Sequence, residues 1–224
     1  MRGRLGAVAI VIAVAAAACS SSHPAASTAT GGPTTTIAPS GPVPATGAVP
    51  WPAPADALAH ARAAGLTPRP FETLEHHVHA HLDVFLDRSP VTVPAGIGIN
   101  IHDPAVHRLA VDGQPAYGAI SPACKQACIS PLHTHDVTGI LHTESPTDVD
   151  NTLGEFFIEW GVALDASCVG GYCRPAWKIA IYVDGHDIGA ADPRTIQLTN
   201  HKEIAIVIGV PPAQIPSKGD FSQV

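Results

Sequence analysis

The stretch Val78-His79-Ala80-His81-Leu82-Asp83-Val84-Phe85-Leu86 alternates strictly between two kinds of side chain. Its even-numbered positions are all apolar, and its odd-numbered positions carry two histidines, an aspartate and a phenylalanine. Successive side chains of a β-strand point to opposite faces of the sheet. The pattern therefore predicts a strand with one face in the core and with histidines, including the preceding His77, on the other face.

A second group of histidines follows in Leu132-His-Thr-His-Asp-Val-Thr-Gly-Ile-Leu-His-Thr-Glu144. We interpret this segment as a hairpin in which residues 138–139, Thr-Gly, form a two-residue turn. In that register His135 faces His142 and His133 faces Glu144, with opposed Cβ atoms ~5 Å apart on one side of the hairpin. A bulge at the turn would shift the register by one residue and separate these side chains.

Histidines that alternate along a strand can converge on one ion, and imidazoles with a carboxylate suit zinc or Cu(II). We therefore predict one divalent copper or zinc ion as cofactor; the alternative is a polar histidine face that binds metal only adventitiously. Two aspartates, Asp83 and Asp136, are expected to accept hydrogen bonds from ligating imidazoles and so orient them. The expected ligands, in decreasing order of preference, are His79, His81, His133 and His135, then His142, then His77 and Glu144.

The N-terminus has the features of an export signal. Two arginines lie within the first four residues, an apolar run extends from Leu5 to Ala18, and the small residues Ala16, Ala17 and Ala18 directly precede Cys19. This segment resembles the lipobox of bacterial lipoproteins, with Ala16 in the place of the usual leucine. The resemblance implies a signal peptide at 1–18, lipidation (palmitate) of Cys19 and anchoring at the outer face of the cytoplasmic membrane. The alternative is an ordinary cleaved signal with an incidental cysteine.

Residues 19–54 are mainly Ser, Thr, Ala, Pro and Gly, a composition that predicts a disordered tether. Residues 55–224 are expected to form a single β-rich, histidine-rich domain. The net charge of −7 and the lack of Lys/Arg clusters argue against nucleic acid as partner and against membrane contact other than through a lipid anchor. The expected partner is the metal ion, and the sequence does not decide whether the protein also binds an envelope protein.

The remaining patterns predict a mainly β (α+β) domain. Thr152 to Trp160 combines a helical apolar stripe with a capping box and a following glycine. We expect an antiparallel β-sandwich or small barrel with this one amphipathic helix packed on it; a β-grasp-like sheet around the helix is the alternative. Further expected elements are a short helix at 56–64, strands at 91–93, 97–101, 176–183 and 203–208, and hairpin turns at 112–113 and 184–185.

The chain has five cysteines, and four remain when Cys19 is assigned to lipidation. In an oxidising exported compartment we expect the local disulfides Cys124–Cys128 and Cys168–Cys173, although four cysteines allow other pairings. The first pair, read with the following histidine, also resembles the CxxxC motifs of copper-handling thioredoxin-like chaperones and of binuclear copper electron-transfer domains. Here the histidine is one residue farther away, and Met1 is the only methionine.

Residues 128–142, with the later segments 152–160 and 203–209, resemble a group of uncharacterised exported bacterial and archaeal proteins. Those proteins carry an LHTHD-x-[ST]-G-[IV]-[IL]-H block, and the resemblance covers roughly residues 75 to 220. It implies that the block is a unit, and it implies no activity.

Together these patterns predict a surface-anchored lipoprotein that binds Cu(II) or Zn(II) for extracytoplasmic metal homeostasis or delivery. A metalloenzyme is the alternative, either a copper redox enzyme or a zinc hydrolase with a base such as Glu144 or Asp136. The sequence contains no Gly-x-Ser-x-Gly, His-Glu-x-x-His or phosphate-binding loop, so whether the protein is an enzyme stays open. The second alternative is an envelope interaction domain without metal.

Overall fold

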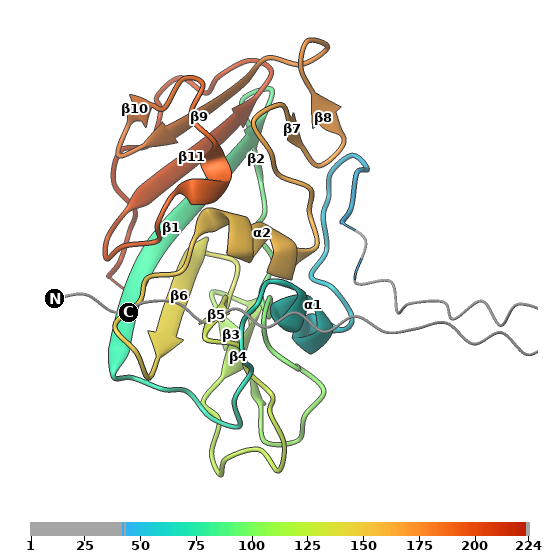
Figure 1. Cartoon of the computed structure of the whole chain (residues 1–224), viewed down its shortest axis with the longest axis vertical. Helices are drawn as coiled ribbons and strands as arrows, with labels where there is room; N and C mark the ends of the chain where they lie inside the picture. The colour runs from blue at the N-terminus through green and yellow to red at the C-terminus, as the bar shows by residue number, and fades with distance from the viewer. Residues whose placement is uncertain (1–41, 43, 223–224) are drawn as a thin grey trace, which may run out of the picture. The chain divides into compact units, whose positions relative to one another are not determined.

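The computed structural model describes residue 42 and residues 44–222 (Figure 1). The predicted signal peptide, the lipidation site at Cys19 and most of the predicted tether lie outside the described residues and stay predictions. The described elements, in chain order, are α1 (Ala57–Ala63), β1 (His76–Leu86), β2 (Ser89–Val91), β3 (His107–Val111), β4 (Gln114–Gly118), β5 (Leu132–His133), β6 (Ile140–Ser145), α2 (Leu153–Trp160), β7 (Cys168–Val169), β8 (Tyr172–Cys173), β9 (Ile179–Val183), β10 (His186–Asp187), the 3-10 turn η1 (Pro193–Thr195) and β11 (Glu203–Ile208).

The main sheet has seven strands in the order β10-β9-β11-β1-β6-β5, and β2 pairs with the end of β1. The first and last long strands, β1 and β11, run parallel at its centre, and their other neighbours are antiparallel. The fold is mainly β as expected, but the antiparallel sandwich or barrel is wrong, because the described sheet is mixed and not closed. The described residues also form two small two-stranded sheets, β3–β4 and β7–β8.

The predicted alternation of β1 is confirmed. Its residues Ala80, Leu82 and Val84 are buried and belong to the main hydrophobic core. The helix α2 covers this face (Figure 1), and its aromatic side chains are in the same core. The opposite face of β1 carries the histidines, so core packing alone decides on which side of the sheet they lie.

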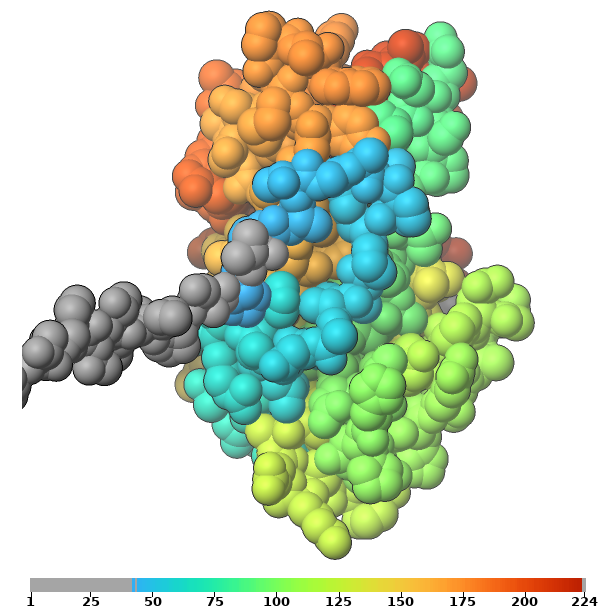
Figure 2. All heavy atoms as spheres, turned by 90° about the vertical axis from the view of Figure 1, so that its right-hand side faces the viewer, coloured from blue at the N-terminus to red at the C-terminus, as the bar shows by residue number. Residues whose placement is uncertain are grey.

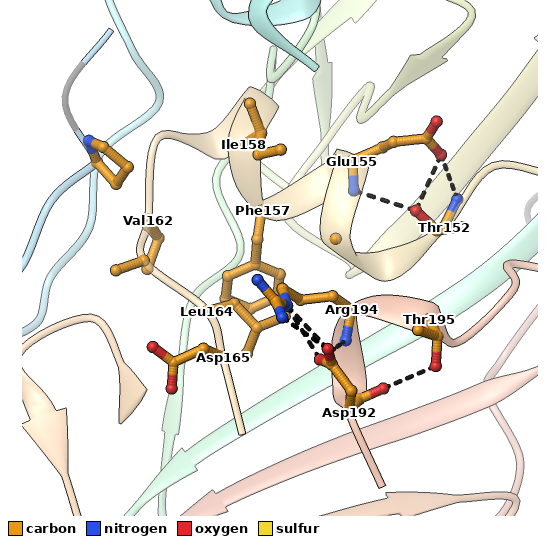
Figure 3. A pocket seen from close by; sticks show the side chains of 13 residues that line it. Thr152, Glu155, Phe157, Ile158, Val162, Leu164, Asp165, Asp192, Arg194 and Thr195 are labelled. Atoms are coloured by element: carbon orange, nitrogen blue, oxygen red, sulfur yellow. Dashed lines mark hydrogen bonds and ion pairs between the residues drawn. The ribbon is translucent and has the colours of Figure 1, made fainter. Parts of the chain in front are cut away.

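The helix α2 has the predicted capping box. The Thr152 hydroxyl accepts a hydrogen bond from the Glu155 backbone N–H at 3.2 Å, and the Glu155 carboxylate accepts one from the Thr152 backbone N–H at 2.6 Å (Figure 3). Gly161 ends the helix with a φ of +71°. The short helix α1 and the two-residue turns of the β3–β4 and β9–β10 hairpins are also confirmed.

The strand predicted at 97–101 is wrong, because this buried segment forms successive turns. Gly98 has a φ of +74° within the expected strand, and Gly96, just before it, has a φ of +82°, so the chain bends at both positions. The neighbouring prediction at 91–93 overlaps β2 only at Val91. The apolar residues at alternate positions of the segment 97–101 therefore reflect its burial and not an extended backbone.

The packed domain begins before residue 55, inside the segment predicted as tether. Trp51 is buried in the main core, with its ring centroid 5.6 Å from that of Trp160. Its indole N–H donates to the Gly47 carbonyl at 3.0 Å, and the Trp160 indole N–H donates to the Trp51 carbonyl at 3.1 Å. Figure 2 shows this blue segment lying on the orange one, where Ala45 forms a bridge with Val162.

Both local disulfides, Cys124–Cys128 and Cys168–Cys173, are confirmed. With its sulfurs bonded to each other, the first pair offers no thiolate to a metal. Disulfides are typical of an oxidising, extracytoplasmic compartment. Among the described residues, neither helix is long and apolar enough to cross a membrane.

Replacing Trp51 tests whether the residues before 55 belong to the domain. We expect Trp51→Ala to lower the free energy of unfolding by about 3–5 kcal/mol, as for other buried tryptophans. As a control, Val149→Ala, at a side chain that is 62% exposed, should change it by no more than about 0.5 kcal/mol. Urea unfolding followed by circular dichroism measures both, and equal effects would contradict the packing of this segment.

Candidate metal centre

The pairing of β1 with β6 brings the two histidine groups of the sequence together. In this antiparallel register His79 lies opposite His142, and His77 lies opposite Glu144. On the other side of β6, His133 of β5 also lies opposite His142. These five side chains therefore share the face of the sheet that α2 does not cover.

The predicted register of the second histidine segment is wrong by two residues. His133, and not His135, pairs with His142, and the connection from β5 to β6 runs over residues 134–139 instead of a two-residue turn. Because side chains alternate with a period of two, a shift by two positions keeps each side chain on its face. The actual register therefore changes which residues lie opposite each other, but the same side chains still share one face of the sheet.

His135 lies in this connection and is held by β4. Its backbone carbonyl accepts a hydrogen bond from the Tyr117 N–H at 2.9 Å, and its ring Nδ1 lies 2.6 Å from the Tyr117 carbonyl oxygen. The next residue, Gly118, leaves room for the ring, since a Cβ there would lie 2.7 Å from His135 Nδ1. The hairpin β3–β4 thus fixes a histidine that no strand of the main sheet carries.

The ring nitrogens of His133 and His135 have defined roles. His133 is completely buried, and its Nδ1 lies 2.9 Å from the Ser130 carbonyl oxygen. A carbonyl oxygen can only accept, so in each neutral ring the proton is on Nδ1 and Nε2 carries a lone pair. The two Nε2 atoms are 3.2 Å apart. Ligand atoms around a tetrahedral ion with bonds of 2.0–2.1 Å are about 3.3 Å apart, so this pair has the spacing of two metal ligands.

Glu144 and His142 complete this group. Glu144 Oε1 is 3.5 Å from His142 Nδ1 and 3.7 Å from His133 Nε2. Both His142 Nδ1 and Glu144 Oε2 are buried without a hydrogen-bond partner. Buried polar atoms rarely stay unsatisfied, and an ion would satisfy these. His133, His135, His142 and Glu144 each offer a ligand atom within 4.8 Å of the others.

His77, His79 and His142 form a second, overlapping group with the same spacing. The His79 ring centroid is 4.5 Å from that of His77 and 4.5 Å from that of His142. His79 Nε2 is buried without a hydrogen-bond partner, and His77 Nε2 is 3.3 Å from Glu144 Oε1. Six of the seven predicted ligands therefore lie in one continuous cluster.

Burial keeps these imidazoles neutral, as ligands must be. Burial, reinforced by the charge of neighbouring His135, lowers the pKa of His133 well below its usual value and that of His142 to about 2. Burial and the charge of His77 lower the pKa of His79 to about 4. None of the three would be in the positively charged imidazolium form at neutral pH.

The structure places the seventh predicted ligand, His81, in a separate group with Asp83 and Glu203. Its Nδ1 is 2.8 Å from Glu203 Oε2 and its Nε2 is 2.9 Å from the Thr138 carbonyl oxygen, so protein groups occupy both nitrogens. Burial would lower the pKa of His81, but the hydrogen bond and charge of Glu203 outweigh it and raise that pKa.

The two aspartates expected to orient ligands do not contact the six-residue cluster through their carboxylates. Asp83 Oδ2 is 3.9 Å from His81 Nδ1, and Asp136 accepts hydrogen bonds from the Thr138 N–H and hydroxyl. The carbonyls of Ser130 and Tyr117 hold the rings of His133 and His135 instead. Backbone carbonyls leave no trace in a residue pattern, which is why sequence reasoning missed them.

A cavity of about 350 Å³ adjoins the cluster and contains a carboxyl group that sequence reasoning also missed. This group is Glu72, whose Oε1 is buried without a hydrogen-bond partner. Burial and the charge of Glu144 raise its pKa. Glu72 lies in a loop before β1, where no periodic pattern marks it. The cavity is lined by Glu72, Leu74, His77, His79, His135, Asp136, His142 and Glu144.

A larger cavity of about 570 Å³ lies beside α2 and η1 (Figure 3). Its charged groups include an exposed ion pair between Arg194 and Asp192 and the carboxylates of Glu155 and Asp165. It contains no histidine, and Glu155 is occupied in the capping box. Of these two cavities, only the one of about 350 Å³ is lined by residues of the histidine cluster.

Comparisons of the chain with protein-family models, with curated proteins and with solved structures found no match.

The pH dependence of the metal-free fold tests the burial of these imidazoles. An unfolded histidine titrates near 6.5, whereas the pKa of folded His142 is about 2. Below pH 6.5 the unfolded chain therefore binds more protons, and the stabilisation present above 6.5 is lost as pH falls. The loss is at most about 1.4 kcal/mol per pH unit for this side chain.

Urea unfolding in the presence of a chelator, between pH 7 and pH 4.5, measures this slope. The variant His142→Gln removes one titrating group and should show a shallower slope than the wild type. Identical slopes in the two proteins would mean that His142 titrates normally in the folded state.

Proposed function

We propose that this chain is an extracytoplasmic, lipid-anchored protein that binds Cu(II) or Zn(II) for metal homeostasis or delivery. The observation that carries the proposal is that the Nε2 atoms of His133 and His135 lie 3.2 Å apart. In each ring Nδ1 donates its proton to a backbone carbonyl, so both Nε2 atoms carry a lone pair. Without a proton or a cation between them, two lone pairs at this distance repel each other. A divalent cation turns the same geometry into two bonds.

The donor set supports the choice of metal. Nitrogen from imidazole and oxygen from Glu144 are the donors within reach, and the nearest cysteines in sequence, Cys124 and Cys128, are joined in a disulfide. Imidazole and carboxylate suit Zn(II) and Cu(II), whereas Cu(I) prefers thiolate and thioether. The two disulfides and the predicted export signal support a location outside the cytoplasm.

Metal analysis of paired variants tests the proposal. The full chain, exported from its host, extracted in detergent and carrying no affinity His-tag, should contain at least one equivalent of copper or zinc. The variant His133→Ala/His135→Ala should lose that metal. A matched control, His107→Ala/His186→Ala, removes two exposed histidines outside the cluster and should retain it.

Near-ultraviolet circular dichroism would show whether each variant is folded, and His135→Gln provides a milder change at a side chain that is only partly buried. Metal at trace level in the wild type, or equal metal in all folded variants, would contradict the proposal and favour an envelope interaction domain without metal.

A substitution that leaves every ligand in place gives a finer test. Gly118→Ala would push against the His135 ring, and we expect the metal affinity to fall about 10–100-fold, as when a ligand loses its orienting partner. Gly113→Ala is the matched control, because Gly113 also has a positive φ in the same hairpin but has no atom within 4 Å of the added methyl group. Competition with a chromophoric chelator measures both affinities, and an equal change in the two would contradict the positioning role of Gly118.

The cavity beside the cluster favours a metalloenzyme as second candidate, either a zinc hydrolase or a copper redox enzyme. A zinc-bound water would need a base, and Glu72 has a raised pKa and an unpaired buried oxygen in this cavity. For this candidate, Glu72→Gln should abolish ester hydrolysis by the zinc-loaded protein while leaving the metal bound. Turnover that is absent in the wild type would favour the carrier, whereas turnover that is unchanged in the variant would contradict Glu72 as the base.

A further inference from the structure

His142 occupies the centre of the cluster. It belongs to both ligand groups, and its ring centroid lies 4.4 Å from that of His135 on one side and 4.5 Å from that of His79 on the other. Its ring also stacks on that of His133, with an interplanar angle of 11° and a centroid separation of 5.3 Å. Every ligand group of the cluster therefore includes this one imidazole.

The nitrogens of His142 differ from those of its neighbours. His133 and His135 each commit Nδ1 to a backbone carbonyl, so each has one nitrogen left for a metal. His142 Nδ1 is buried without a hydrogen-bond partner and lies 3.5 Å from Glu144 Oε1. No backbone carbonyl among the described residues binds this ring as Ser130 and Tyr117 bind the other two, so each of its nitrogens can bind an ion.

The cluster also holds more donors than one ion takes. Five imidazoles and the Glu144 carboxylate are present, whereas a zinc ion in a protein takes four ligands. One group (His133, His135, His142, Glu144) is buried apart from the partly buried His135, and the other (His77, His79, His142) includes the exposed His77. Glu144 Oε1 lies between them, 3.3 Å from His77 Nε2 and 3.7 Å from His133 Nε2.

We propose that the cluster binds two divalent ions, one in each group, and that His142 bridges them as an imidazolate. This inference rests on the proposed function, because it divides the same metal site in two. When the second ion binds, the ring proton of His142 leaves to solvent and each nitrogen donates one lone pair to one ion. The first ion has four protein ligands, whereas the second has three and faces the cavity with a position free for water.

The burial of the two groups sets the order of filling. The buried group holds its donors with two carbonyl hydrogen bonds and should bind first and more tightly. The group that contains His77 should fill second, and its loss should leave the first ion in place. Because His77 and His79 belong only to the second group, substituting them should remove the second site and leave the first intact.

Titration of the metal-free full chain with Cu(II) tests the two-ion centre. We expect two equivalents to bind, with the electron paramagnetic resonance signal growing up to the first and falling toward the second, because an imidazolate bridge pairs the spins of two Cu(II) ions. His77→Ala/His79→Ala should bind one equivalent and keep its full signal. The matched control is His76→Ala, on the opposite face of β1 where its ring contacts Asp148 and Asp150, and it should behave as the wild type.

The outcomes separate the two proposals. No copper bound by the wild type contradicts the proposed function itself. One equivalent with an undiminished signal overturns the two-ion centre and leaves a single-ion site standing. Two equivalents with the full signal of two isolated ions overturn the bridge through His142. Loss of both ions in the folded His77→Ala/His79→Ala variant would contradict the division of the cluster into two groups.

Discussion

The antiparallel pairing of β1 with β6 is the constraint on which both the core and the site depend. The register that sets Ala80 opposite Leu141 beneath α2 also sets His79 opposite His142 on the other face. A slip of one residue would bury imidazoles under the aromatic side chains of α2 and turn the apolar residues outward. Hydrophobic packing on one side of the sheet therefore specifies the geometry of the histidine cluster on the other side.

The same arrangement makes the metal-free state unfavourable at the site. Lone pairs of His133 and His135 face each other, and buried atoms of His142, His79 and Glu144 have no hydrogen-bond partner. The surrounding fold must stabilise this geometry, since the cluster does not stabilise itself. A bound cation would remove these penalties, so its binding would add to the stability of the fold.

Local features of this fold could be predicted from sequence, and long-range pairings could not. The alternation of β1, the capping box of α2 and both disulfides follow from residues close together in the chain. The parallel pairing of β1 with β11 joins segments that are far apart in the sequence, and no residue pattern in either strand indicates which strand it pairs with. The same holds for the site. Six of the seven residues predicted as ligands lie together in space, whereas His81 lies apart, and neither Glu72 nor the carbonyls that hold the rings are marked by a sequence pattern.

Ligation by the histidine cluster can be tested by X-ray absorption at the copper or zinc edge of the metal-loaded full chain. We expect nitrogen and oxygen ligands at about 2.0–2.1 Å without sulfur, together with the outer-shell scattering of at least three imidazole rings. A sulfur shell at about 2.3 Å, or a shell of oxygen without imidazole scattering, would contradict ligation by the histidines of β1, β5 and β6.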